Sequence, residues 1–163
     1  MMGVLLPTLL AAKGGERPAV SLDTQGVAQR CLCISMSPEC TLLAVNGTLM
    51  RGLELNGNLI AGGARFVRED RTVAAYRLYS IGDRHPGMVR VADGGVSVAV
   101  EVWSVPLEGL TGLLLKEPAG LCIGKVSLLH GQETLGVLAE SMLCEGQREI
   151  SEFGGWREYC AGR

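Results

Sequence analysis

The chain has few of the residues and motifs on which common active sites depend. It contains two histidines and shows no Ser-His-Asp or Cys-His arrangement, which argues against a catalytic triad. It has no Gly-x-Gly-x-x-Gly or Gly-x4-Gly-Lys-Ser/Thr pattern, so we expect no nucleotide and no other cofactor. Its six cysteines include no Cys-x-x-Cys pair. We therefore expect no metal site and interpret the cysteines as reduced thiols of a cytoplasmic protein.

Strong net charge and long apolar runs are also missing. The net charge is −2 and no Lys/Arg cluster occurs, so we expect no nucleic-acid partner. The apolar run at 3–12 is interrupted by Pro7 and is too short to span a bilayer. We therefore expect no membrane partner. Aromatic residues form 4% of the chain while glycines number 23, which indicates many turns and closely approaching backbones.

Residues 1–35 differ from the rest of the chain. They have few alternating apolar positions and several glycines. Two interpretations stay open: an extension upstream of a natural start at Met36, or a loosely packed N-terminal arm. Residues 36–163 have the apolar content and length of a single domain with a real core.

Strand signals dominate from residue 41 onward. Alternating or β-branched apolar runs predict strands at 41–46, 64–67, 72–80, 88–92, 96–103, 121–129 and 134–140. We expect turns at 68–71, 93–95 and 130–131, and a loop at 82–87. Pro106, followed by Leu107, Leu110 and Leu114, predicts an amphipathic helix. The aromatic tail at 150–159 is expected to lie across the domain. These elements predict an α+β, mostly β, fold: a small antiparallel barrel or curled sheet with one or two packed helices.

The most informative segment is the turn formed by Asn46, Gly47, Thr48, Leu49 and Met50, here called the 46–50 turn. It follows an apolar strand, and its backbone N–H groups are available if a short helix begins there. Successive N–H groups that point into one concavity can hold a carboxylate or carbamate. The alternative is an ordinary strand-to-helix turn with no ligand.

Glu117 is the candidate acid–base group. It lies at the end of the predicted helix beside apolar residues, where partial burial would raise its pKa toward neutrality. The alternative is a solvated charge at the end of a helix.

Three further side chains have two interpretations each. Glu101 lies in the middle of a strand and either faces water or is buried against a partner such as Arg90 or Arg77. His85 either gates a pocket or lies on a surface loop. Cys122 is predicted to be a small core residue.

Several blocks together resemble a known family. They are Asn-Gly-Thr-Leu-Met-Arg-Gly at 46–52, Leu-Asn at 55–56, Tyr-Arg-Leu-Tyr at 76–79, Pro-Gly at 86–87 with Arg90, Gly-Gly at 94–95, Glu-Val-Trp at 101–103, Leu-Cys-Ile-Gly-Lys-Val at 121–126 and Gly-Gly-Trp-Arg at 154–157. In this order and spacing they are similar to the C-terminal domain of allophanate hydrolase over about residues 40–160. That domain resembles the γ-glutamylcyclotransferases in fold.

The resemblance implies a pocket built on the 46–50 turn. Gly47, Thr48 and Leu49 match the substrate-binding turn of the cyclotransferases, with Asn46 in place of an aromatic residue. Glu117 falls at about the place of their catalytic glutamate. The resemblance thus implies that Glu117 is catalytic, and that Arg90 and the 46–50 turn, including Met50, bind substrate.

Three functions follow as hypotheses. The first is a stand-alone allophanate hydrolase C-domain-like protein of amide or urea metabolism. It would bind a small carboxylated amide or carbamate and catalyse its decarboxylation or cleavage. The second is a non-catalytic binding or assembly module that partners a separate amidase. The third is γ-glutamylcyclotransferase-like activity. The sequence leaves a homo-oligomer open.

Overall fold

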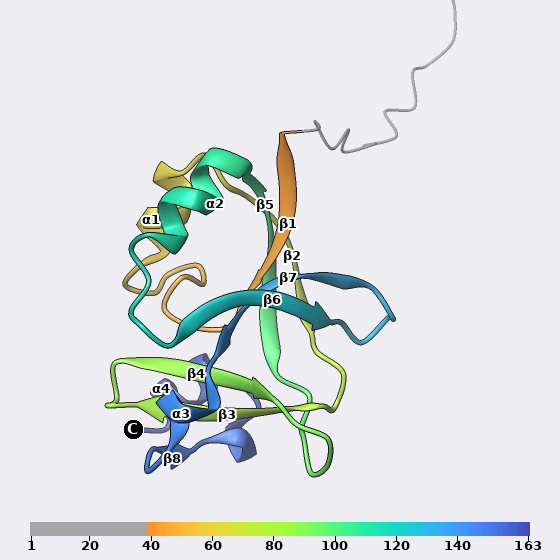
Figure 1. Ribbon diagram of the computed structural model, residues 1–163, viewed down its shortest axis with the longest axis vertical. Helices are drawn as coiled ribbons and strands as arrows, with labels where there is room; N and C mark the ends of the chain where they lie inside the picture. Colours follow the sequence, from red (N-terminus) through yellow and green to blue (C-terminus); the bar gives the residue numbers. More distant parts are fainter. Residues whose placement is uncertain (1–38) are drawn as a thin grey trace, which may run out of the picture. The chain divides into compact units, whose positions relative to one another are not determined.

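The computed structural model describes residues 39–163, so the predicted extension at 1–35 lies outside the described residues. The polypeptide forms two β-sheets with short helices (Figure 1). The strands are β1 (Cys40–Val45), β2 (Arg65–Arg71), β3 (Tyr76–Ile81), β4 (His85–Arg90), β5 (Ala99–Pro106), β6 (Leu121–Ser127), β7 (Glu133–Ala139) and β8 (Arg148–Glu149). The helices are α1 (Asn56–Ala61), α2 (Leu107–Leu114), α3 (Ser141–Cys144), the 3-10 turn η1 (Ser151–Phe153) and α4 (Trp156–Ala161).

The larger sheet has the strand order β2-β5-β1-β7-β6, and the smaller has β4-β3-β8. All neighbouring strands are antiparallel except β1 and β7, which are parallel. The mostly-β α+β prediction is confirmed. The predicted barrel is wrong in one respect, because the two sheets do not close on each other through hydrogen bonds.

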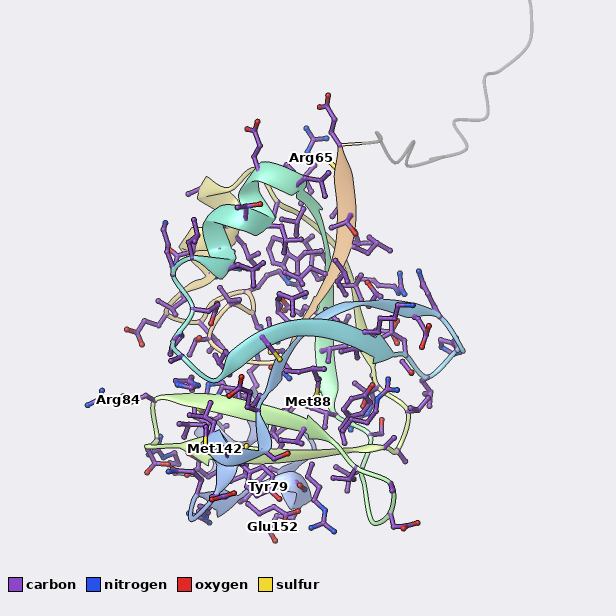
Figure 2. All side chains as sticks on the ribbon, in the orientation of Figure 1. Arg65, Tyr79, Arg84, Met88, Met142 and Glu152 are labelled. Atoms are coloured by element: carbon purple, nitrogen blue, oxygen red, sulfur yellow. The ribbon has the colours of Figure 1, made fainter. Side chains whose placement is uncertain are left out.

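Two apolar clusters hold these layers together. One lies between the sheets and includes Ala44 of β1, Leu78 of β3, Met88 of β4 and Val126 of β6. Figure 2 shows Met88 in this interior position, whereas Arg84, in the β3–β4 connection, extends away from the domain.

The other cluster lies between the larger sheet and helices α1 and α2. Leu43, Trp103 and Val105 of the sheet pack there against Leu59 of α1 and Leu110 of α2. Since β1 and β5 contribute to both clusters, they are buried on both faces. That explains why Glu101, Val102 and Trp103 are all buried, where alternation alone predicted one buried face.

The structure corrects three predicted connections. Residues 68–71 continue β2 rather than turning, because β2 is an edge strand whose polar side chains remain exposed. His85 and Pro86 begin β4 rather than lying in a loop, and Pro86 is tolerated because β4 is also an edge strand. The turn at 93–95 does not close a hairpin. Strand β4 pairs with β3 while β5 pairs with β1 and β2, so this segment joins the two sheets.

Other predictions are confirmed. Strands β6 and β7 form the expected hairpin, and His130 lies exposed at its tip. Helix α2 begins directly after Pro106. The tail crosses the domain and buries Trp156 and Tyr159, although part of it forms the short helix α4. No helix in residues 39–163 has the length and apolar content needed to cross a membrane.

The cysteines are only partly as predicted. Cys40, Cys122, Cys144 and Cys160 carry free thiols, whereas Cys31 and Cys33 lie outside the described residues. Cys122 is exposed rather than in the core, because its strand β6 is at the edge of the larger sheet.

Candidate functional site

The 46–50 turn and Glu117 border one cavity, here called the turn cavity. Its volume is about 50 Å³, and its walls include Asn46, Gly47, Thr48, Leu49, His85 and Glu117. These residues come from the end of β1, the start of β4 and the segment after α2. The 46–50 turn and Glu117, which are about seventy positions apart in the sequence, therefore lie at one cavity. The hypothesis that Glu117 acts on a ligand bound by the turn requires this arrangement.

Three consecutive carbonyl groups of the turn accept hydrogen bonds within the protein. The Gly47 carbonyl accepts a hydrogen bond from the Met50 N–H at 2.8 Å, and the Thr48 carbonyl accepts one from the Leu55 N–H at 2.9 Å. The Asn56 side chain donates to the Leu49 carbonyl at 2.8 Å. In a trans peptide the N–H points opposite to the carbonyl. Because the carbonyls of Gly47 and Thr48 are hydrogen-bonded on one side of the turn, the N–H groups of Thr48 and Leu49 point to the other side of the turn.

Two backbone donors of the turn have no hydrogen-bond partner in the part of the chain that the structure describes. Within residues 39–163, the N–H groups of Thr48 and Leu49 have no protein acceptor, whereas the Met50 N–H donates to the Gly47 carbonyl. Both Thr48 and Leu49 line the cavity. Paired backbone donors at a concave surface are suited to a carboxylate oxygen.

Asn46 and Gly47 fix the start of the turn. Asn46 is buried, and its side-chain amide donates to the Val137 carbonyl of β7 at 3.4 Å. Pro86 packs directly on Gly47, so a methyl group there would lie 2.5 Å from the Pro86 Cγ atom. Glycine is therefore needed at position 47, because any side chain there would clash with Pro86.

We expect Gly47→Ala to destabilise the protein by about 1–3 kcal/mol, because the new methyl group must displace the buried Pro86 ring. Thermal unfolding measures this change. Gly57→Ala is the matched control: it adds the same methyl group to α1 in open space and should be neutral or slightly stabilising. Equal stability of the two variants would contradict the tight Gly47–Pro86 contact.

Glu117 is half-buried at the cavity wall. Burial raises the pKa of its carboxyl above the ordinary value of 4.5, and the charge of nearby His85 opposes that shift only in part. His85 itself is half-buried, and its Nδ1 lies 3.3 Å from the Pro86 carbonyl oxygen. His85 is thus a cavity residue rather than a surface-loop residue.

The structure places the other two predicted substrate-binding residues away from the turn cavity. Met50 is buried in the cluster beneath α1 and α2. The Arg90 guanidinium donates to the Tyr76 hydroxyl at 2.8 Å and to the Ser127 hydroxyl at 2.9 Å. Those bonds join β3, β4 and β6, so Arg90 connects the two sheets.

Glu101 has partners that sequence reasoning missed. It is fully buried and pairs with Arg51 and Arg157, not with Arg90 or Arg77. Neither partner is close to Glu101 in the sequence, and only the pairing of β5 with β1 brings Arg51 close. In residues 39–163 no group of three or more His, Cys, Asp or Glu side chains is arranged to hold a metal ion.

Comparison with known proteins gives the family. Residues 41–161 match the allophanate hydrolase C-terminal domain. The chain belongs to this family. Urea amidolyase of Saccharomyces cerevisiae is 32% identical over 124 residues, which cover 72% of this chain and 7% of that protein. The chain spans about 7% of the length of the curated relatives it matches.

Solved structures agree with this membership. A uropathogenic E. coli-specific protein is 63% identical with a TM-score of 0.74, over 76% of this chain and 98% of that one. Kluyveromyces lactis allophanate hydrolase is 31% identical with a TM-score of 0.71, over 75% of this chain and 21% of that one. An AIG2-like protein from Mus musculus, 17% identical with a TM-score of 0.54 over 69% of this chain and 87% of that one, shares the fold alone. The γ-glutamylcyclotransferase-like fold is therefore confirmed for this allophanate hydrolase C-terminal domain.

Proposed function

We propose that the turn cavity binds a small carboxylated amide or carbamate and that Glu117 supplies a proton for its decarboxylation or cleavage. The observation that carries the proposal is that Thr48 and Leu49, whose N–H groups have no acceptor among the described residues, border the same cavity as the partly buried Glu117. The N–H groups of Thr48 and Leu49 bind the carboxylate of the ligand, and Glu117 faces its reacting end.

The size of the cavity favours a ligand of a few heavy atoms. At about 50 Å³ it is well below the roughly 300–1,000 Å³ of sites for drug-sized molecules. A carboxylated carbamate suits this volume better than a γ-glutamyl amino acid. For that reason the cyclotransferase-like alternative is less favoured.

The proposed reaction needs one proton and no redox partner. In an N-carboxycarbamate, the bond between nitrogen and one carboxylate carbon breaks and carbon dioxide leaves. The electron pair of that bond stays on nitrogen, which takes the proton of neutral Glu117. The product is carbamate, and Glu117 regains its proton from water. A carboxyl with a raised pKa is suited to this role, because a larger fraction of it is protonated near neutral pH.

The first experiment is a binding titration with malonate, which replaces the reacting N–H of N-carboxycarbamate by CH₂ and so does not turn over. We expect malonate to shift the amide resonances of Thr48 and Leu49. Glutarate, which carries two further methylenes, should bind at least about tenfold more weakly in so small a cavity. Equal binding of both acids, or none of either, would count against the proposal.

The pH dependence of turnover gives a second test. Neutral Glu117 is the active form, so the rate should be highest below its pKa and should fall as the pH rises through it. Because burial raises this pKa, the fall should be centred above 4.5, the ordinary value for glutamate. A rate that rises through the same range would identify Glu117 as a base rather than an acid.

One observation favours the alternative of an assembly module. Helix α2 and the residue after it expose three leucines, Leu107 at 51%, Leu114 at 40% and Leu115 at 83%. Exposed apolar groups of this kind occur on surfaces that bind other proteins. A stable complex with a separate amidase, together with no turnover of N-carboxycarbamate, would support the module in place of the enzyme.

A further inference from the structure

Arg51, the residue directly after the 46–50 turn, is held through both of its backbone groups. Its N–H donates to Oε2 of Glu101 at 2.9 Å, across 50 positions of sequence. Its carbonyl accepts a hydrogen bond from the Arg157 guanidinium, across 106 positions. The place where the turn ends is thus fixed by side chains of β5 and α4 in addition to the local hydrogen bonds of the turn.

Glu101 is itself fixed by four donors. Its Oε1 accepts from Arg51 Nε at 3.1 Å and from Arg157 Nη2 at 3.0 Å. Its Oε2 accepts from the Arg51 N–H and from Trp103 Nε1 at 3.1 Å. With each oxygen bound twice and no exposed surface, the carboxylate has little freedom to rotate.

The charge on Glu101 is maintained in this environment. Burial acts to raise the pKa of the carboxyl, but the hydrogen bonds from Arg51, Arg157 and Trp103 outweigh it and lower the pKa below 4.5. Arg51 is restrained further, because its guanidinium lies 3.5 Å from the centre of the Phe66 ring and 2.6 Å from Glu69.

We propose that Glu101 and Arg157 are positioning residues of the turn cavity, which hold Arg51 so that the N–H groups of Thr48 and Leu49 keep the orientation that a carboxylate needs. The two donors lie two and three residues before Arg51, and the Gly47–Met50 hydrogen bond makes the intervening turn compact. A shift of Arg51 therefore moves the donors. This inference rests on the proposed function for the identity of the ligand.

Arg157→Met is the variant that tests the positioning role. It removes both donors of Arg157 but leaves the buried Glu101 with three of its four hydrogen bonds. Arg68→Met is the matched control, because Arg68 is similarly exposed (39% against 36%) and also pairs with an acid, Asp70. Arg68 does not line the turn cavity.

In the free protein, we expect Arg157→Met to shift the amide resonances of Thr48 and Leu49. It should also speed hydrogen exchange of the Arg51 amide about tenfold, which corresponds to the loss of one hydrogen bond to a charged group. In the malonate titration, we expect Arg157→Met to bind malonate about tenfold more weakly than the wild-type protein does. Arg68→Met should leave all three measurements as in wild type.

A second variant separates positioning from general stability. Arg157→Lys keeps the positive charge beside Glu101. It replaces the planar guanidinium, whose Nη2 donates both to Glu101 and to the Arg51 carbonyl, with a shorter and more flexible side chain that does not hold both bonds in one fixed geometry. Compared with Arg157→Met, the Arg157→Lys variant should therefore recover more of the wild-type thermal stability than of the wild-type malonate affinity.

The outcomes distinguish the two proposals. Unchanged Thr48 and Leu49 resonances in Arg157→Met would overturn the positioning role, whatever the ligand does, because this measurement needs no ligand. A wild-type protein that does not bind malonate would instead count against the proposed function.

Discussion

Glu101→Gln should lower the free energy of unfolding by about 3 kcal/mol. The substitution keeps the size of the side chain but removes the charge that Arg51 and Arg157 face at 3.1 and 3.0 Å. Breaking a buried ion pair costs roughly 3–5 kcal/mol. We expect the lower end, because the arginine side chains are 42% and 36% exposed and water partly solvates them. Chemical denaturation at neutral pH measures the change.

Glu69→Gln is the control for this prediction. Glu69 pairs with the same Arg51 at 2.6 Å, but its side chain is 71% exposed. Exposed ion pairs contribute little, so this variant should stay within about 0.5 kcal/mol of wild type. Similar losses in the two variants would contradict the view that burial makes the Glu101 pairing important.

The effect of Glu101 should depend on pH in a defined direction. Its folded-state pKa is lowered, so its contribution to stability is fully present above 4.5, the ordinary value for glutamate in the unfolded chain. The contribution is lost as the pH falls through the lower folded-state pKa. The stability difference between wild type and Glu101→Gln should therefore narrow below pH 4.5.

Glu117→Gln should reduce turnover of N-carboxycarbamate by about 10²–10⁴-fold, the usual contribution of a positioned proton donor. Glutamine preserves the shape and polarity of the cavity wall but cannot transfer the proton that the leaving nitrogen needs. The substrate can be generated in the assay by a separate amidase, with release of carbon dioxide as the measured signal. Malonate affinity should change by no more than a few fold, because the donors at Thr48 and Leu49 are untouched.

Glu108→Gln provides the comparison. Glu108 is an exposed glutamate of α2 that does not line the turn cavity, so its variant should turn over substrate like wild type. Equal rates for Glu117→Gln and Glu108→Gln would exclude Glu117 as the proton donor.

The sequence was informative where local chemistry decides the structure. Gly47 and the strand before it predicted a turn with free backbone donors. Of the three N–H groups of residues 48–50, those of Thr48 and Leu49 have no acceptor within residues 39–163. The third belongs to Met50 and bonds to Gly47, because the turn is tighter than the sequence indicated. Pro106 and the leucines after it likewise predicted α2, since helix capping and spacing are local.

Sequence reasoning was less successful where partners are distant. The Asp-Gly-Gly segment at 93–95 signals a change of direction but not which strands it joins, and it leads from one sheet to the other. Glu101 was recognised as a residue that would need a partner if buried. Its partners, Arg51 and Arg157, come close only through the pairing of β5 with β1 and the docking of α4. The substrate-binding role of Arg90 stays a prediction, and the contacts of its guanidinium between the sheets could not be read from the sequence.

A crystal structure of the protein with malonate tests the central claim most directly. We predict one malonate carboxylate within hydrogen-bonding distance of the Thr48 and Leu49 N–H groups, with the other end directed toward Glu117. An empty turn cavity at saturating malonate, or malonate bound elsewhere with Glu117 turned to solvent, would contradict it.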